Sequence, residues 1–97
     1  MERKENEDLK KRTKEFIKQV IIAYQKLPKS DAIRDIGRQF LRSGSSVGAN
    51  TRSAFRGRSR KEFIAKLGIV IEEADECLFW MEVMSETPLV QQDFSYR

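Results

Sequence analysis

Residues suited to a buried face recur at alternating steps of four and three along most of this chain, the spacing that an α-helix places on one side. The first such stretch runs from about Glu5 to Lys26, and Pro28 ends it because proline cannot continue a helix. Ile17 and Ile21 widen the stripe, so this helix is expected to touch two neighbours. An average repeat near 3.5 is typical of helices packed almost parallel in a bundle. The positions of the face are Leu9, Thr13, Phe16, Val20, Ala23 and Leu27.

The pattern predicts a second helix from Asp31 to about Arg56. Ser30 is a suitable N-cap, because its hydroxyl can accept a hydrogen bond from a free backbone N–H of the first turn. Asp31 follows in the first turn, where the helix dipole favours an acid. The face positions of this helix are Ile33, Ile36, Phe40, Ser43, Val47, Asn50 and Ala54.

Three glycines, Gly37, Gly44 and Gly48, form a row beside that face. Each weakens a helix by about 1 kcal/mol relative to alanine, so something must offset the cost. Close approach of another backbone is the simplest candidate. We therefore predict a continuous helix packed tightly on a neighbour, and the alternative is a kink or break at residues 43–46.

Asn50 is the polar residue of the face that most needs an explanation. A buried amide must find partners for its donors and acceptor, or it costs on the order of 1–3 kcal/mol. We interpret Asn50 as an interior hydrogen-bonding group that sets the register between helices. The alternative is an asparagine turned to solvent at a frayed bend.

The third predicted helix, from about residue 60 to 84, has the most regular pattern. Gly57 is expected to take the left-handed conformation that often closes the preceding helix. Ser59 and Glu62 then have the spacing of a capping box, in which each side chain satisfies a free backbone N–H. The face positions are Phe63, Leu67, Val70, Ala74, Cys77, Met81 and Met84, with Ile64, Ile71 and Leu78 alongside.

The last ten residues, from Pro88 to Arg97, are too few for a helix that matches the other three. They include four large apolar side chains, Leu89, Val90, Phe94 and Tyr96. The segment is therefore expected to be a shortened fourth helix or a strap across the end of the bundle.

Composition argues against catalysis and against a membrane location. The 97 residues include no histidine and a single cysteine, Cys77, so the usual general base, the usual zinc ligand and an internal disulfide are missing. A di-metal site built from Glu72, Glu73, Asp75 and Glu76 would need histidine partners, and these acids are better interpreted as a solvated or interface face. The charged amino terminus and the lack of a long apolar run predict a cytoplasmic protein. No cofactor is expected.

Charge is distributed unevenly along the chain. Residues 36–61 contain seven basic residues and no acid, whereas the segment that begins at Glu72 contains seven acids and one base, Arg97. Basic side chains without acidic neighbours favour contact with phosphates. The candidate nucleic-acid-binding residues are Arg38, Arg42, Arg52, Arg56, Arg58, Arg60 and Lys61. The alternative is that these residues pair with the acids of the third helix, within one molecule or between copies.

A family resemblance is carried by residues 46–50, SVGAN, followed by Arg58-Ser59 and Glu62-Phe63. The chain resembles four-helix-bundle proteins encoded in intervening sequences of bacterial large-subunit ribosomal RNA, together with the accessory protein of diversity-generating retroelements. The resemblance implies an all-α, antiparallel up-down bundle, here with a fourth helix that is short or truncated. It also implies ring-shaped homo-oligomers, with a pentamer favoured, and nucleic-acid binding by a basic surface.

These observations lead to two competing hypotheses. In the first, a non-enzymatic, self-associating bundle binds structured RNA or DNA, or a nucleoprotein partner such as a reverse transcriptase, through its basic surface. Nothing in the pattern indicates sequence-specific readout. In the second, the protein is an assembly scaffold whose basic and acidic faces meet between subunits, with no nucleic-acid binding.

Overall fold

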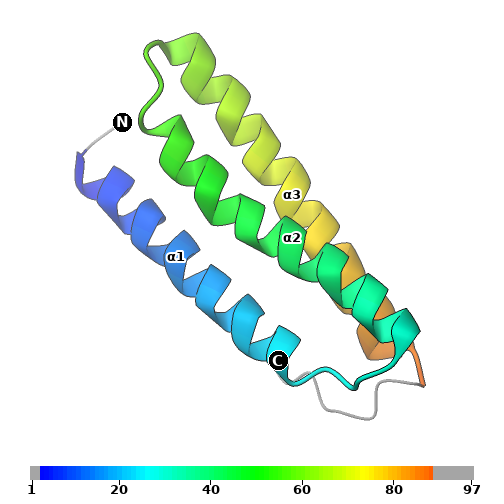
Figure 1. Ribbon diagram of the computed structural model, residues 1–97. Helices are drawn as coiled ribbons and strands as arrows, with labels where there is room; N and C mark the ends of the chain where they lie inside the picture. Colours follow the sequence, from blue (N-terminus) through cyan, green and yellow to red (C-terminus); the bar gives the residue numbers. More distant parts are fainter. Residues whose placement is uncertain (1–2, 89–97) are drawn as a thin grey trace.

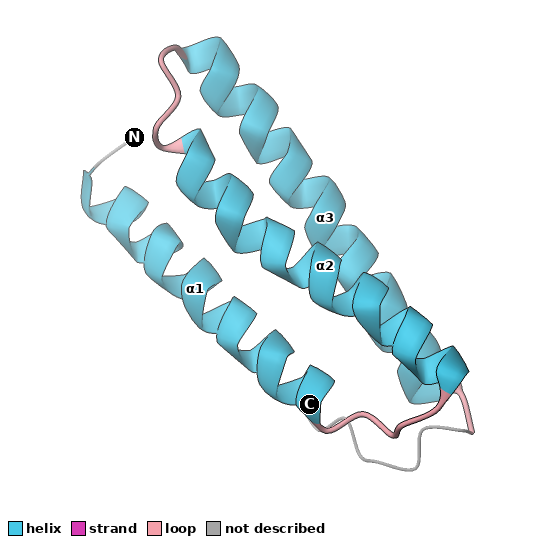
Figure 2. Ribbon diagram, in the orientation of Figure 1, coloured by secondary structure: helices cyan, strands magenta, loops and turns pink. Residues whose placement is uncertain are grey.

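The computed structural model describes residues 3–88, which form three antiparallel helices joined by two short loops (Figures 1 and 2). Helix α1 spans Arg3–Gln25, α2 spans Asp31–Ala54 and α3 spans Arg60–Glu86. The molecule is a rod of 45 × 21 × 17 Å. Helix α2 lies between the other two, so α1 and α3 both pack along α2.

The expectation of a four-helix bundle is wrong, because the described residues contain three helices. The helical pattern of apolar residues occurs three times in the sequence, and the short fourth helix was expected from the apolar residues after Pro88 and from the resemblance. Helix α3 continues two residues beyond the expected end at Met84, after which Thr87 has an extended conformation and Pro88 follows. Residues 89–97, on which the shortened fourth helix or strap was expected, lie outside the described part of the chain.

The core forms where side chains from all three helices meet. Val20 of α1, Phe40 of α2, and Cys77 and Met84 of α3 are at most 3% exposed and form one cluster. Face positions predicted from the sequence supply all four residues. Burial of this kind is the main contribution to the stability of a small helical domain.

The glycines of α2 lie against α1 and against Leu27, which follows it. Gly37 and Gly44 meet side chains there, and of the three glycines only Gly48 shows the expected approach of another backbone. A Cβ atom built on Gly44 would lie 2.8 Å from Val20 Cγ1, and one on Gly37 would lie 2.8 Å from Leu27 Cδ1. A Cβ on Gly48 would overlap Ile17 Cδ1 and come within 3.4 Å of the Thr13 carbonyl oxygen. Helix α2 is continuous through residues 43–46, so the alternative of a break is excluded.

The polar residues of the α2 face bond within their own helix. Ser43 and Thr51 are fully buried, and their hydroxyls donate to the carbonyls of Gln39 and Val47 at 2.8 and 2.7 Å. The partly buried Asn50 likewise donates through Nδ2 to the Ser46 carbonyl at 2.9 Å. This bond stays inside α2, so it does not set the register between helices as we expected.

Two serines begin the second and third helices. Ser30 Oγ accepts from the Ile33 N–H at 3.2 Å, and Ser59 Oγ accepts from the Glu62 N–H at 3.1 Å. Glu62 Oε1 accepts from the Arg58 N–H at 2.9 Å, one residue before the donor that a standard capping box uses. The left-handed Gly57 is a wrong prediction, because no residue in the described part of the chain has a positive φ. Helix α2 ends at Ala54 in a tight turn instead.

Among the described residues, α1 packs along α2 and meets α3 in the shared core, but one side of α1 that was expected to touch a neighbour is open. Ile21 and Ile22 of α1 are 41% and 43% exposed. Large apolar side chains of α3 are exposed as well, with Ile64 at 56%, Ile71 at 69% and Leu78 at 52%. These three lie at seven-residue steps and therefore follow one side of α3.

Candidate nucleic-acid interface

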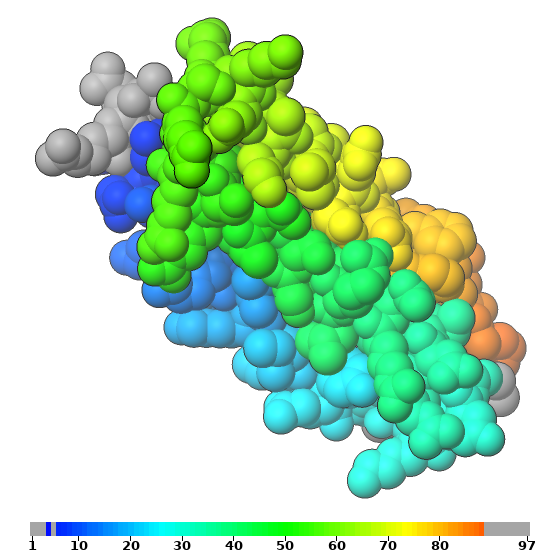
Figure 3. Space-filling model, turned by 45° about the horizontal axis from the view of Figure 1, so that its top comes forward, coloured from blue at the N-terminus to red at the C-terminus, as the bar shows by residue number. Residues whose placement is uncertain are grey.

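Three segments bring basic residues to one end of the rod. Helix α1 begins at this end, and α2 and α3 are joined there by residues 55–59 (Figure 1). The space-filling view places the first half of α1 beside this turn and the second half of α2 (Figure 3). We call this region the basic end and define it by the residues Lys10, Lys11, Lys14, Arg52, Arg56, Arg58, Arg60 and Lys61.

A cleft of about 550 Å³ lies between α1 and α2 at the basic end. Four of its lining residues have apolar or small side chains: Ile17, Gly48, Ala49 and Phe55. The cleft is therefore an apolar hollow with a charged surround. The other lining residues are Glu7, Lys10, Lys11, Thr13, Lys14, Arg52 and Arg56.

Most cations around the cleft have no acidic partner. Lys10 Nζ lies 2.9 Å from the Glu7 carboxylate and 5.9 Å from the centre of the Phe55 ring. The remaining four, Lys11, Lys14, Arg52 and Arg56, are exposed and make no ion pair within residues 3–88. Like charges held close together without acids create a positive potential that attracts anions.

The turn between α2 and α3 extends this positive surface. The side chains of Arg58, Arg60 and Lys61 are exposed and form no ion pair within the described part of the chain. Their backbone is held in place by the Ser59 and Glu62 contacts that begin α3. Five of the seven predicted residues, Arg52, Arg56, Arg58, Arg60 and Lys61, therefore share one end of the molecule.

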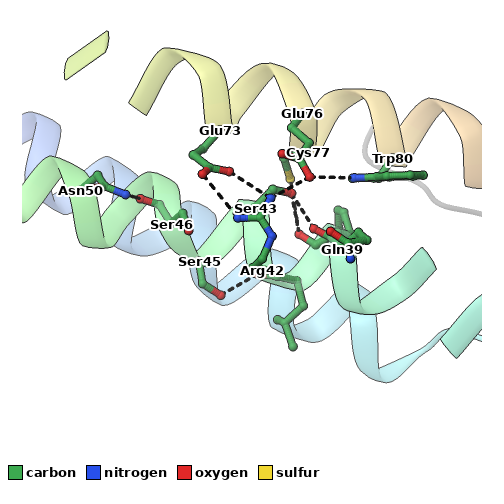
Figure 4. A network of polar contacts seen from close by, with 12 residues as sticks. Gln39, Arg42, Ser43, Ser45, Ser46, Asn50, Glu73, Glu76, Cys77 and Trp80 are labelled. Atoms are coloured by element: carbon green, nitrogen blue, oxygen red, sulfur yellow. Dashed lines mark hydrogen bonds and ion pairs between the residues drawn. The ribbon is translucent and has the colours of Figure 1, made fainter. Parts of the chain in front are cut away.

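Arg42 does not belong to this surface, because α3 neutralises it. Its Nη2 atom lies 2.7 Å from Glu76 Oε2 and 3.3 Å from Glu73 Oε1, and Trp80 Nε1 donates to Glu76 at 3.1 Å (Figure 4). The hydrogen bonds from Arg42 and Trp80 lower the pKa of Glu76. The bond to Glu76, followed by the one to Glu73, raises the pKa of Arg42. The alternative of pairing with the acids of α3 therefore holds for this residue.

Arg38 is exposed and makes no ion pair within residues 3–88, but it lies far from the basic end. Fourteen residues separate it from Arg52, which at 1.5 Å per residue is about 21 Å along α2. The sequence placed Arg38 and Arg42 in the same group as Arg52 because all three belong to one stretch without acids. The fold separates the three residues, because Arg42 faces α3 and Arg38 lies towards the end of α2 that is opposite the basic end.

Lys11 and Lys14 are the site residues that sequence reasoning missed. They belong to a segment of mixed charge near the amino terminus, where Lys10 and Arg12 have acidic partners at three- and four-residue spacing. At these spacings the sequence gives Lys14 no acid, which was the available signal for that residue. It gives Lys11 three acids, Glu7, Asp8 and Glu15, so nothing in the sequence marked Lys11. Their position beside Arg52 depends on the antiparallel packing of α1 on α2.

The two aromatic residues near these sites, Phe55 and Trp80, are partly buried. The ring centre of Phe55 lies 5.4 Å from that of Phe63, and Phe55 also lines the cleft. Trp80 packs against the core cluster and not on an outer face. Cys77 is fully buried, and burial raises the pKa of its thiol.

The described residues contain no helix that is long and apolar enough to cross a membrane. They also contain no group of three or more acidic, cysteine or histidine side chains close enough to hold a metal ion. In particular, Glu73 and Glu76 are both engaged by Arg42, while Glu72 and Asp75 are exposed.

Comparison with known proteins supports one part of the resemblance. A crystal structure of a protein of unknown function from the S23 ribosomal protein family of Bacteroides thetaiotaomicron is similar to this fold, with a TM-score of 0.75 and 32% sequence identity over 90% of this chain and 78% of the other. No curated protein matches the sequence significantly. The link to retroelement accessory proteins is untested and stays a prediction. Residues 5–96 match the model of the 23S rRNA-intervening sequence protein family. The chain therefore belongs to the 23S rRNA-intervening sequence protein family.

Proposed function

We propose that this protein binds structured RNA through its basic end and performs no chemistry on it. The observation that carries the proposal is the group of cations that α1, α2 and the following turn bring together, of which all but Lys10 make no ion pair within residues 3–88. Membership in a family named for ribosomal RNA intervening sequences supports RNA as the ligand. The retroelement resemblance would add a reverse transcriptase as a protein partner, which co-purification with the enzyme would test.

Binding of this kind is expected to depend strongly on salt. Each phosphate that a lysine or arginine contacts releases condensed counterions, so the logarithm of the affinity falls linearly with the logarithm of the salt concentration. The slope changes by about 0.9 per phosphate contact on a duplex. Four to six contacts at the basic end would correspond to a slope of about −4 to −5.

The test is a titration of a fluorescent RNA hairpin at several salt concentrations. Replacing Arg52 and Arg56 by glutamine should weaken binding and reduce the slope by about 2. The control is Arg38→Gln, which removes another exposed arginine, about 21 Å from Arg52 along α2. It should leave the slope unchanged. Salt-independent binding, or an equal loss in both variants, would contradict the proposal.

A second function, self-association, is favoured by the exposed apolar row on α3. Ile64, Ile71 and Leu78 are each more than half exposed on one side of α3, and large exposed apolar patches often mark interaction sites. Exposed acids also lie on α3, namely Glu72, Asp75, Glu82 and Glu86. We therefore propose that a second copy covers this row. The family resemblance implies that the assembly is a ring, with a pentamer favoured.

Sizing by light scattering across a salt series tests the assembly. Ile71→Lys should shift the particle towards the monomer, because it places a charge in an apolar contact. Lys66→Gln on the same helix, at a partly buried position away from the row, serves as the control. If the Arg52 and Arg56 variant also dissociates the particle, the basic end serves subunit contact and the protein is an assembly scaffold.

A further inference from the structure

We infer that the cleft between α1 and α2 holds one unpaired nucleotide of the bound RNA. The base would rest on the apolar lining, and the neighbouring phosphates would contact the cations around it. This inference rests on the proposed function and deepens it, because a basic surface alone would bind duplex and single strand through their phosphates. It assigns the cleft a chemical class of ligand, an unstacked nucleobase with flanking phosphates.

The lining of the cleft suits the face of a base. Ile17, Gly48, Ala49 and the ring of Phe55 contribute apolar surface to the lining. The Lys10 ammonium lies 5.9 Å from the centre of the Phe55 ring and would move aside towards a phosphate when a base stacks there. Phe55 is partly buried against Phe63, so its ring is held in position before any ligand arrives. Stacking on a positioned aromatic ring is the common way in which proteins hold an unpaired base.

The surround of the cleft suits phosphates on both sides. Lys11 and Lys14 lie three residues apart and therefore follow one side of α1. Arg52 lies in the last turn of α2 and Arg56 in the turn that follows the helix, and both line the cleft. All four are exposed and make no ion pair with the described residues. A strand that places its base between the two helices would meet cations on either side of that base.

The cleft offers little with which to distinguish one base from another. Thr13 is the uncharged polar side chain of the lining, and its hydroxyl already donates to the carbonyls of Leu9 and Lys10 at 3.0 and 3.1 Å. Discrimination between bases requires hydrogen bonds to their edges. The site is therefore expected to accept any base, and stacking strength alone would set a mild preference.

Paired bases cannot use the cleft in this way. Within a helix the faces of the bases are covered by their neighbours, and only unpaired nucleotides can place a face on a protein side chain. A cavity of about 550 Å³ falls within the range of sites that enclose a small ligand. An acidic peptide would also match the charge, but it would leave the apolar lining without a flat partner.

The experiment compares a single-stranded RNA oligonucleotide with a blunt duplex of the same sequence at the same salt concentration. The strand carries one 2-aminopurine, whose fluorescence falls when it stacks on an aromatic ring. The native protein should bind the strand at least about fivefold more tightly than the duplex and quench the fluorescence. Phe55→Leu retains an apolar contact with Phe63 but removes the ring. This variant should bind the single strand about fivefold or more weakly than the native protein does, and it should no longer quench the 2-aminopurine fluorescence. Its affinity for the duplex should be nearly unchanged.

Two controls separate stacking from a loss of structure. Phe79→Leu changes a ring on α3 that is 52% exposed and does not line the cleft, so it should bind like the native protein. A strand with an abasic residue in place of the 2-aminopurine tests the same contact with the native protein and should bind weakly. This second measurement remains decisive if Phe55→Leu does not fold.

The outcomes distinguish this inference from the proposed function. Equal binding of strand and duplex, with no quench and no effect of the abasic residue, would overturn the nucleotide site while salt-dependent RNA binding stands. Displacement of a strand by polyglutamate, without any quench in the strand complex, would assign the cleft to acidic polypeptide. Failure to bind either RNA at low salt would remove both proposals.

Discussion

The Arg42 guanidinium lies 2.7 Å from the Glu76 carboxylate, 34 positions later in the chain, and this contact joins α2 to α3 (Figure 4). Glu76 also accepts from the Trp80 indole N–H, so one carboxylate connects a cation with a residue packed on the core. The contact explains why a basic residue of the acid-free stretch is unavailable to nucleic acid. It also makes stability dependent on pH.

Removing the Glu76 carboxylate should lower the free energy of unfolding at neutral pH but not in acid. The pKa of Glu76 is lowered in the folded state, chiefly by Arg42. Its stabilising effect is therefore complete above the ordinary carboxyl pKa, about 4.3, and is lost as the pH falls through the lower pKa of the folded state. In urea unfolding, Glu76→Gln should lower the free energy of unfolding by about 1 kcal/mol or less at pH 7, because the pair with Arg42 is partly exposed. Near pH 2 the substitution should have no measurable effect.

The matched control for this measurement is Glu72→Gln, an exposed acid of the same helix that makes no ion pair within residues 3–88. Its effect on the free energy of unfolding at pH 7 should be smaller. An equal effect of the two variants would show that general charge, and not the Arg42 contact, is responsible.

Two glycine-to-alanine changes should alter stability in opposite directions. A Cβ on Gly44 would lie 2.8 and 2.9 Å from the two Val20 methyl carbons and 3.3 Å from the Cys77 sulfur, whereas nothing lies within 4 Å of a Cβ on Gly68. Valine cannot easily rotate away, because a branched side chain in a helix has one favoured rotamer. Gly44→Ala should therefore cost about 1–2 kcal/mol after the gain in helix propensity, and Gly68→Ala should gain up to about 1 kcal/mol.

Thermal unfolding followed by circular dichroism measures both changes. In a domain of this size 1 kcal/mol corresponds to a shift of about 4–8 °C in Tm. A lower Tm for Gly44→Ala together with a higher one for Gly68→Ala is expected. Stabilisation by both would mean that helix propensity outweighs the contact between α1 and α2.

The Cys77 thiol should be unreactive in the folded protein. It is 0% exposed, and burial raises the pKa of the thiol, so both access and the thiolate fraction are reduced. Ellman's reagent at pH 8 should react rapidly in denaturing urea and at least about a hundredfold more slowly in buffer, at a rate set by unfolding. Rapid reaction in buffer would contradict the packing of the three helices around Cys77.

The start of α3 should depend on Ser59. Its hydroxyl satisfies the Glu62 N–H, and replacing an N-cap serine by alanine typically costs about 1 kcal/mol. Ser59→Ala should lower the Tm by several degrees. Ser85→Ala, at an exposed position of α3 whose hydroxyl bonds to the Glu82 carbonyl, should change it less. Equal shifts would indicate that the cap contributes no more than any exposed serine.

Local features could be predicted because they depend on nearby residues. The spacing of apolar residues placed α1, α2 and α3 within a few residues, and Ser30 and Ser59 marked the helix starts. A helix period and a cap are encoded within a few turns of chain. The wrong local prediction, a left-handed Gly57, arose because a tight turn with negative φ closes α2 equally well.

The amino-acid pattern was sufficient for the existence of the three helices, their inward faces and the glycine row, since each follows from periodicity or from steric limits along one helix. The division of the basic residues depended on packing. Contacts across helices neutralise Arg42 with Glu73 and Glu76, and antiparallel packing brings Lys11 and Lys14 beside Arg52. Charges act through space, so their partners and the cleft they surround exist only after distant segments have come together.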